Sequence, residues 1–335
     1  MSDKKYIINN ILVDDIKTIL HRAKSKVYQT INHTMTQTYW EIGKRIVEEE
    51  QAGETRAKYG KEIIKTLSLE LSKEFGKGFS VRNLEQMRKF YIAFPKSQTA
   101  STKFKLSWSH YIFLSRILNK DERDFYEIES IQNSWSLREL KRQFNSGLFE
   151  RLSLSRDKTA VKELSQKGQI IQSVDDLIKD PYILEFVGLP ELHSYSESEL
   201  EQKLIDKLEH FLLELGKGFT FVARQKRITI DEDHFKVDLV FYNRFLKSFV
   251  IIDLKIGKLK HQDIGQMMMY VNYFDRVEKT QDENKTIGII LCKDKSKALV
   301  EMTLPEDNEQ IYASKYLTIL PNKEEFVKLL EGEDG

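Results

Sequence analysis

The chain of 335 residues is 40% hydrophobic, 11% aromatic and 31% charged, which is enough apolar material for one large domain or two ordinary ones. Because Cys292 is its single cysteine, a disulfide scaffold and a zinc site built on paired cysteines are excluded. No apolar run is as long as a membrane span and no cleavable leader follows the first residues. We therefore expect a cytoplasmic protein without membrane contact.

The net charge of +1 conceals a difference between the two halves of the chain. Residues 1–150 contain 26 Lys and Arg against 19 Asp and Glu, a balance of +7, whereas residues 151–335 contain 27 against 33, a balance of −6. This asymmetry favours two domains with different roles, of which the basic one is a candidate for binding polyanions. An ordinary solvated helix surface would have the same composition, so charge alone leaves both interpretations open.

Apolar residues at spacings of three and four predict helices through most of residues 11–150. One of these helices ends at the Gly-Lys-Gly sequence 76–78, and Ser80 then occupies the N-cap position of the next, which Pro95 ends. A helix, a glycine-containing turn and a capped helix are typical of a helix-turn-helix. The predicted helices cover residues 16–27, 34–50, 60–75, 81–94, 108–119, 121–130 and 136–152.

The helix predicted over 81–94 has side chains of the kinds that contact phosphates and base edges in DNA complexes. We therefore expect the N-terminal region to bind DNA through this helix, although the solvated face of a helical hairpin would look similar. The candidate DNA contacts on it are Arg82, Asn83, Gln86, Arg88 and Lys89.

From residue 196 the pattern changes to alternating helices and apolar strands, which predicts a mixed sheet covered by helices. The fold class that we expect is α+β: a helical domain over 1–155, a connector over 156–195 and a domain with a mixed central sheet over 196–335. The predicted helices of the last domain cover 198–215, 261–277 and 296–302, and its predicted strands cover 219–230, 235–242, 248–256, 286–292 and 316–320.

Two carboxylates interrupt strands that are otherwise apolar. Asp253 lies within the predicted strand 248–256, and Asp238 lies fifteen residues before it, within 235–242. A carboxylate in such a position is costly unless it is paired or binds a metal. Because adjacent antiparallel strands would place the two acids side by side, their mutual repulsion favours a cation between them. The alternative is a structural ion pair of either acid with a lysine.

Mg²⁺ suits such a pair of acids, because it prefers carboxylate oxygens and retains several of its waters. We expect Asp238, Asp253 and the backbone carbonyl of Leu254 to hold this ion. Mn²⁺ is an alternative ion for the same site. The strand period of two places Lys255 on the face of Asp253. There its charge would orient a water or stabilise a phosphorane-like charge.

A third acid is expected near the start of the helix predicted over 198–215. Glu201 is favoured because it borders the apolar stripe of that helix, while Glu197 and Glu199 are rivals and a solvated helix face is the alternative for each. On the following helix Gln266 and Tyr270 are four residues apart and share a face. They would hold a phosphate or a base near the metal, or form only a polar helix edge.

Basic residues flank the acids, as a nucleic-acid backbone requires at a cleavage site. The candidate contacts among them are Arg224, Lys226 and Lys258. The sequence has no Gly-x4-Gly-Lys-Ser/Thr loop and no Gly-x-Gly-x-x-Gly fingerprint, so no nucleotide cofactor is expected. It also has no His-Glu-x-x-His or Gly-x-Ser-x-Gly sequence, which removes support for the corresponding protease and hydrolase chemistries.

The order of a helix acid, Asp238, Asp253-x-Lys255 and Gln266-xxx-Tyr270 resembles the PD-(D/E)XK nuclease superfamily. Within it, nearly the entire chain resembles the bacterial YhcG-type family, also called domain of unknown function 1016. The segments that carry this resemblance are LSWSH at 106–110, WSLREL at 135–140, DPYILEF at 180–186, FLLELG at 211–216 and IGIILC at 287–292.

The resemblance implies a restriction-endonuclease-like core that cuts phosphodiesters with Mg²⁺, together with an N-terminal helical module of winged-helix character. It also implies a role in DNA processing, restriction or mobile-element defence. The sequence departs from the family at Asp253, where a glutamate is expected. The superfamily accepts either acid, but the shorter side chain would hold the metal less closely.

We therefore expect a Mg²⁺-dependent DNA endonuclease, with DNA as its partner and a homo-oligomer compatible with the sequence. The alternative is a catalytically inactive DNA-binding accessory protein whose nuclease-like core is only structural. The sequence favours the enzyme, because a decayed site would be expected to lose at least one of the acids or the lysine.

Overall fold

The structure is a computed structural model that describes residues 10–52, 56–95, 104–153, 158–189 and 195–331. Its internal contacts divide the chain into two units, residues 1–140 and 141–335. The predicted domain boundaries at residues 155 and 195 fall in or beside segments outside the described residues, so they stay predictions. No helix within the described ranges is long and apolar enough to cross a lipid bilayer.

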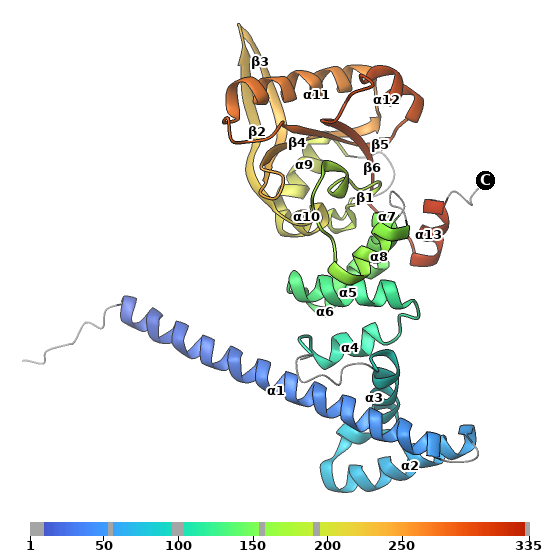
Figure 1. Ribbon diagram of the computed structural model, residues 1–335. Helices are drawn as coiled ribbons and strands as arrows, with labels where there is room; N and C mark the ends of the chain where they lie inside the picture. Colours follow the sequence, from blue (N-terminus) through green and yellow to red (C-terminus); the bar gives the residue numbers. More distant parts are fainter. Residues whose placement is uncertain (1–9, 53–55, 96–103, 154–157, 190–194, 332–335) are drawn as a thin grey trace, which may run out of the picture. The chain divides into compact units, whose positions relative to one another are not determined.

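The first unit is built on α1 (Asn10–Ala52), a single helix of 43 residues where the sequence predicted two. Residues 28–33, between the two predicted helices, include neither glycine nor proline, so nothing ends the first of them. Leu84 and Met87 of α3 pack beside Ile46 of α1 in a buried cluster. The other helices here are α2 (Arg56–Phe75), α3 (Val81–Ala93), α4 (Trp108–Leu114) and α5 (Lys120–Gln132), and α6 (Leu137–Asn145) crosses the boundary (Figure 1).

The predicted turn and helix cap are present between α2 and α3. Gly76 has a φ of +82°, a left-handed conformation that favours glycine, and the short 3₁₀ helix η1 (Lys77–Phe79) follows it. Ser80 then caps α3, because its hydroxyl accepts a hydrogen bond from the backbone N–H of Asn83 at 3.4 Å. The helix-turn-helix pattern of the sequence is therefore present in this unit.

Two helices of the second unit are shorter than the sequence predicted. The helix predicted over 136–152 is divided into α6 and α7 (Leu148–Ser153) beside Gly147, whose φ is +57°. The helix predicted over 198–215 is divided at Lys207. The remaining helical elements are α8 (Lys158–Lys167), η2 (Val174–Asp176), η3 (Glu185–Val187), α9 (Glu197–Asp206), α10 (Leu208–Leu215), α11 (His261–Tyr273), the π-helical η4 (Phe274–Glu278), α12 (Lys297–Thr303) and α13 (Lys323–Glu331).

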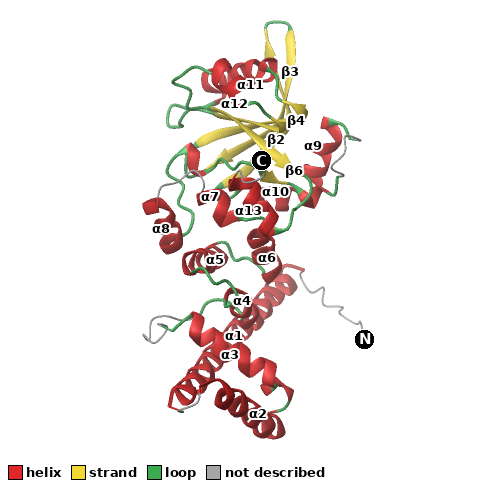
Figure 2. Cartoon of the chain, turned by 90° about the vertical axis from the view of Figure 1, so that its right-hand side faces the viewer, coloured by secondary structure: helices red, strands yellow, loops and turns green. Residues whose placement is uncertain are grey.

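Six strands form one mixed sheet in the order β1-β6-β5-β4-β3-β2. The meander of β2, β3 and β4 is antiparallel, whereas β4, β5, β6 and β1 are parallel to their neighbours. Helices cover both faces of the sheet (Figures 1 and 2). The strands are β1 (Tyr182–Ile183), β2 (Phe219–Ile230), β3 (Asp233–Asn243), β4 (Ser248–Lys258), β5 (Ile287–Asp294) and β6 (Ile311–Leu317).

Alternate residues of β4 enter two separate cores. Ile252 packs in the cluster that includes Phe211 of α10, whereas Ile251 packs in the cluster that includes Met267 of α11. The sheet is therefore the middle layer of a sandwich, with α9 and α10 on one face and α11 and α12 on the other. By the same alternation the side chain of Asp253 belongs to the α11 face.

A buried ion cluster fixes the helices that precede the sheet. Glu214 of α10 is 0% exposed, and its Oε1 accepts hydrogen bonds from Arg151 Nη1 at 2.7 Å and from the Ile183 backbone N–H at 3.0 Å. Its Oε2 accepts one from Arg142 Nη2 at 3.3 Å. Burial alone would raise the pKa of Glu214, but the adjacent cations, Arg151 first and then Lys179 and Arg142, lower it to about 2. These contacts tie α10 to α6, α7 and β1.

Candidate functional site

The two acids that interrupt the apolar strands lie where β3 and β4 stop pairing. The β3–β4 ladder runs from Asn243 opposite Ser248 to Leu239 opposite Ile252. Asp238 and Asp253 are the next residues along the two strands, while β3 continues to pair with β2 on its other side. Because β3 and β4 no longer pair at Asp238 and Asp253, the backbone groups of the two strands are not hydrogen-bonded to each other beside the two carboxylates.

The carboxylate of Asp238 replaces the missing ladder bonds. Its Oδ2 accepts a hydrogen bond from the backbone N–H of Leu254 at 2.9 Å, and its Oδ1 accepts one from Gln225 Nε2 at 3.2 Å. A carboxylate that accepts hydrogen bonds at both oxygens is fixed in orientation. Asp238 is therefore held against β4 from one side and β2 from the other.

Asp253 is only 3% exposed and forms an ion pair with Lys255, whose Nζ lies 2.8 Å from its Oδ2. Burial raises the pKa of Asp253 to about 7, and the charge of Asp238 adds to this effect while that of Lys255 opposes it. The site therefore holds a carboxyl group that is poorly stabilised as an anion by the protein alone.

Lys255 lies between acids of two different elements. In addition to Asp253 it lies 4.0 Å from Oε2 of Glu197 at the start of α9, and Oε1 of Glu197 accepts the backbone N–H of Ile256 at 3.4 Å. Burial by itself would lower the pKa of Lys255, but Asp253 raises it above the usual value. The neighbouring acids therefore favour the ammonium form of Lys255.

The three rival glutamates of α9 have three different environments. Glu201 is 4% exposed and its Oε1 lies 3.2 Å from Arg224 Nε, while Glu199 is exposed and forms the capping box of the helix with Ser196. Burial, and then the charge of Asp238, raises the pKa of Glu201. The structure thus brings Glu201 to the Asp238 side of the site and Glu197 to the Lys255 side.

Gln225 is a site residue that the sequence analysis missed. Its side-chain amide donates to Oε2 of Glu201 at 2.5 Å as well as to Asp238, so it connects the helix acid to the strand acid. Its φ is +46°, a left-handed conformation that is costly for a residue with a side chain. In the sequence Gln225 is one polar residue of a mixed strand, and neither its backbone conformation nor its two partners have a local signal.

Gln266 and Tyr270 are joined to each other on α11. Gln266 Nε2 donates to the Tyr270 hydroxyl at 2.6 Å, and that hydroxyl donates to the carbonyl of Lys236 in β3 at 2.9 Å. Tyr270 is 0% exposed, and burial, followed by the charge of Asp253, raises the pKa of its hydroxyl. Tyr270 therefore anchors α11 to β3, and the partly exposed Gln266 is the member of the pair that can reach a ligand.

The acids of the site offer carboxylate oxygens, the donors that a hard divalent cation prefers. Within the described residues no group of three or more His, Cys, Asp or Glu side chains converges on one point. However, two buried oxygens, Asp253 Oδ2 and Glu201 Oε1, accept no hydrogen bond there and lie only beside the cations Lys255 and Arg224. A hard cation that keeps part of its water shell could replace the ammonium and guanidinium contacts at these oxygens. The oxygens are thus of the kind that Mg²⁺ and Mn²⁺ bind, but within the described residues only two acids, not three, approach one another.

The basic residues expected around the acids differ in their partners. Arg224 binds Glu201 and also donates from Nη1 to Gln202 Oε1 at 3.0 Å, and Lys226 Nζ lies 3.2 Å from Glu278 Oε1. Lys258 is exposed near the end of β4. Two of the three candidates are thus partly neutralised within the protein.

The candidate DNA contacts on α3 separate into two groups. Arg82, Gln86 and Lys89 share one face of the helix and line a pocket. Arg88 instead pairs with Glu50 of α1 at 2.6 Å, and the side chain of Asn83 donates to the carbonyl of Gly78 at 3.0 Å. The sequence could not predict the Arg88 contact, because the two partners are 38 residues apart along the chain.

Two family models match this chain, one in its N-terminal half and one in its C-terminal half. A family model described as the DUF1016 N-terminal domain matches residues 15–151, and one described as the YhcG PDDEXK nuclease domain matches residues 175–331. The chain is 39% identical over 340 residues to "Putative nuclease YhcG" of Escherichia coli (strain K12). That alignment covers 92% of this chain and 90% of the relative.

Two solved structures align with part of this chain. A repair endonuclease from Pyrococcus abyssi aligns with 37% of this chain and 49% of its own, at 19% identity and a TM-score of 0.26. The structure of EndoMS in apo form aligns with 39% of this chain and 49% of its own, at 16% identity and a TM-score of 0.25.

Proposed function

This chain belongs to the YhcG family of proteins with a PD-(D/E)XK nuclease domain, and on that premise we propose that it is a Mg²⁺-dependent DNA endonuclease. The observation that carries the proposal is the position of Asp238, Asp253 and Lys255 where β3 and β4 diverge. Family membership supports this class of reaction, and the geometry supports the choice of groups that would perform it.

In this proposal Asp238, Asp253 and the carbonyl of Leu254 hold the ion, and Glu201 supports it through Gln225. Bound Mg²⁺ would polarise the phosphate and favour deprotonation of water. The high pKa of Asp253 has a clear consequence: a divalent cation would displace the proton that burial otherwise favours.

Lys255 acts in the proposal as a fixed positive charge. Its ammonium, held by Asp253 and near Glu197, would donate a hydrogen bond to the attacking water and stabilise negative charge that develops on the phosphate. The water oxygen bonds to phosphorus and releases a proton to the solvent, the bond to the leaving sugar oxygen breaks, and that oxygen takes up a proton from the solvent. The products are a phosphate monoester and a hydroxyl end.

DNA is the proposed substrate because each unit presents cations suited to its backbone. In the second unit these are Arg224, Lys226 and Lys258, and in the first they are Arg82 and Lys89. The biological role that we propose is DNA processing, restriction or defence against mobile elements, as the family resemblance implies.

The proposal is tested by incubating the full chain with linear, supercoiled, branched and single-stranded DNA in Mg²⁺, in Mn²⁺ and in EDTA. Asp238→Asn, which removes a proposed ligand, is expected to abolish cleavage, whereas Asp282→Asn, which changes an exposed acid before β5, is expected to cut like the wild type. Equal cleavage in EDTA or by Asp238→Asn would contradict the metal role.

A second candidate is an inactive DNA-binding accessory protein with a nuclease-like core. It is favoured by the ion pair between Lys255 and Asp253, which already satisfies part of the charge in the site, and by the absence of three convergent acids within the described residues. In this case DNA binding persists while no substrate is cut with either ion.

A further inference from the structure

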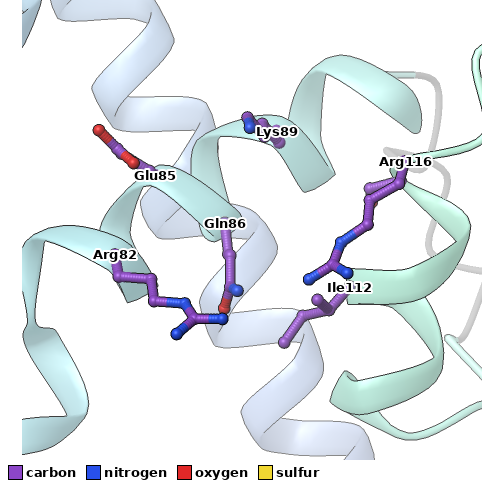
Figure 3. Close-up of a pocket in the computed structure, with 7 residues that line it drawn as sticks. Arg82, Glu85, Gln86, Lys89, Ile112 and Arg116 are labelled. Atoms are coloured by element: carbon purple, nitrogen blue, oxygen red, sulfur yellow. The ribbon is translucent and has the colours of Figure 1, made fainter.

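A pocket of about 330 Å³ lies between α3 and the end of α4 in the first unit. Figure 3 shows Arg82 and Arg116 extending toward Gln86 from opposite sides, whereas Glu85 extends away from Gln86. The residues that line the pocket are Arg82, Glu85, Gln86, Lys89, Ile112, Ser115 and Arg116.

The helix and the segment after α4 both contribute cations to this pocket. Arg82, Gln86 and Lys89 are spaced by four and three residues, so they share one face of α3 over about 10 Å. Arg116 follows α4 in the chain and completes the pocket from outside the helix-turn-helix. A sequence pattern that considers α3 alone therefore leaves out one of the three cations.

The three cations have no anionic partner within the described residues. Neither Arg82, Lys89 nor Arg116 forms an ion pair there, in contrast to Arg88 of the same helix, which pairs with Glu50. Glu85 is the one acid among the lining residues, so the pocket has an excess of positive charge. Converging like charges repel, and an external anion would relieve this repulsion.

The chemistry of the lining favours a phosphate over a base. Two guanidinium groups and an ammonium suit phosphate oxygens, and the Gln86 amide can donate another hydrogen bond. No aromatic ring is among the lining residues, so the described pocket offers no platform on which a base could stack. Ile112 provides an apolar contact for a sugar, and the Ser115 hydroxyl already donates to the Tyr111 carbonyl at 2.6 Å.

We propose that this pocket binds a backbone phosphate of the DNA substrate without reading sequence, and that Arg116 is one of its phosphate ligands. The proposal rests on the proposed function, because it takes DNA as the substrate, and it extends that function to a defined anchor site remote in sequence from the acids. Binding at such a site positions the duplex or strand and leaves cleavage chemistry to the second unit.

The test measures the affinity of the full chain for two duplexes of equal length and unrelated sequence, in EDTA, over a series of KCl concentrations. Arg116→Ala and Lys89→Ala are each expected to weaken binding about tenfold on both duplexes and to reduce the salt slope by about 1. Glu85→Gln is expected to strengthen binding. Arg138→Ala, which removes an exposed arginine of the same unit outside the pocket, is the charge-matched control.

Three results would overturn the proposal. Arg116→Ala could bind like Arg138→Ala, its loss of affinity could depend on the sequence of the duplex, or Glu85→Gln could leave affinity unchanged. Far-UV circular dichroism and tryptophan fluorescence check that the variants fold, since Trp40, Trp108 and Trp135 all belong to this unit. Inorganic pyrophosphate is expected to compete with DNA for the wild type and less well for Arg116→Ala.

The result is separable from the proposed nuclease activity because binding is measured without a divalent ion. If the wild type cuts DNA while Arg116→Ala binds and cuts equally well, the pocket proposal fails and the nuclease proposal stands. If the wild type cuts nothing in Mg²⁺ or Mn²⁺ while Arg116→Ala loses affinity as expected, the pocket stands and the nuclease proposal fails.

Discussion

Substituting Asp253 by Asn should make the metal-free second unit more stable at pH 8 but not at pH 5. Burial raises the pKa of Asp253 from 3.8 to about 7 in the folded protein. Below pH 3.8 both states hold the proton, whereas between that value and pH 7 only the folded state does, so the stability of the wild type falls as pH rises. The asparagine does not titrate and escapes this loss.

The magnitude follows from the pKa. From pH 5 to pH 7 the wild type loses about 1.4 kcal/mol for each pH unit, so the advantage of Asp253→Asn should grow by about 3 kcal/mol between pH 5 and pH 8. The ion pair with Lys255 forms only where Asp253 is ionised, and its effect is already contained in the pKa of about 7, so it adds no separate contribution to this difference. Added Mg²⁺ should reverse the order at pH 8, because it stabilises only the wild type.

The assay uses the buried thiol of Cys292, which is on β5 in register with Lys255 of β4 and is the single cysteine of the chain. The EDTA-treated protein is titrated with urea, and the reactivity of Cys292 toward 4,4′-dithiodipyridine reports unfolding of the sheet. Tryptophan fluorescence, confined to the first unit, should not differ between variants. The free energy of unfolding of the control Asp282→Asn should change with pH as that of the wild type does. If the free energy of unfolding of Asp253→Asn also changes in parallel with that of the wild type from pH 5 to pH 8, the reasoning is refuted.

Two further changes test the supports of the site and of the fold. Gln225→Gly keeps a backbone that tolerates φ +46° but removes the amide between Glu201 and Asp238, so Mn²⁺ affinity by isothermal titration calorimetry should fall about tenfold; an unchanged affinity would exclude a role for the amide. Glu214→Gln should destabilise the second unit by about 3 kcal/mol at pH 7 in the Cys292 assay, because it leaves Arg151 buried without its anion. The stability that Glu214 supplies is present above its unfolded pKa of 4.5 and is lost as pH falls toward 2. A Glu214→Gln variant as stable as the wild type at pH 7 would contradict a stabilising role of this ion cluster.

Strands whose residues alternate between two cores could be predicted almost to the residue. β2 has the predicted bounds 219–230, and β3 and β4 extend their predictions by only one or two residues at an end. Asp238 and Asp253 could be recognised from the sequence because each carboxylate has apolar residues on both sides. Local pattern and tertiary environment agree in this part of the chain.

Elements that depend on long-range contacts could not be predicted. β1 is only two residues long, and Tyr182 and Ile183 are strand residues because they pair with Tyr316 and Leu317 of β6. The last strand was expected over 316–320 but is Ile311–Leu317, and α13 was not predicted. No spacing rule within a short segment detects a partner so far along the chain.

The same limit applies to the site. Glu201 was favoured on helix periodicity, but its connection to Asp238 depends on Gln225, a residue of another element with an unusual backbone conformation. Arg116 likewise joins the α3 cations only through the packing of α4. Residue types and spacing could therefore nominate the acids and the lysine as candidates, whereas the groups that hold them in place required the fold.

Single-turnover cleavage of DNA by the wild type and by Lys255→Ala in Mg²⁺ distinguishes a nuclease from an inactive DNA-binding protein. We expect that the wild type cuts, that EDTA stops it, and that Lys255→Ala binds DNA and Mg²⁺ equally well but cuts slower by about two orders of magnitude or more. Lys255→Arg should recover little, because a planar guanidinium does not replace a compact ammonium. The opposite result would be a wild-type protein that binds DNA but cuts no substrate with Mg²⁺ or Mn²⁺, together with a Lys255→Ala variant that binds DNA equally well. That result would contradict a catalytic role for Lys255.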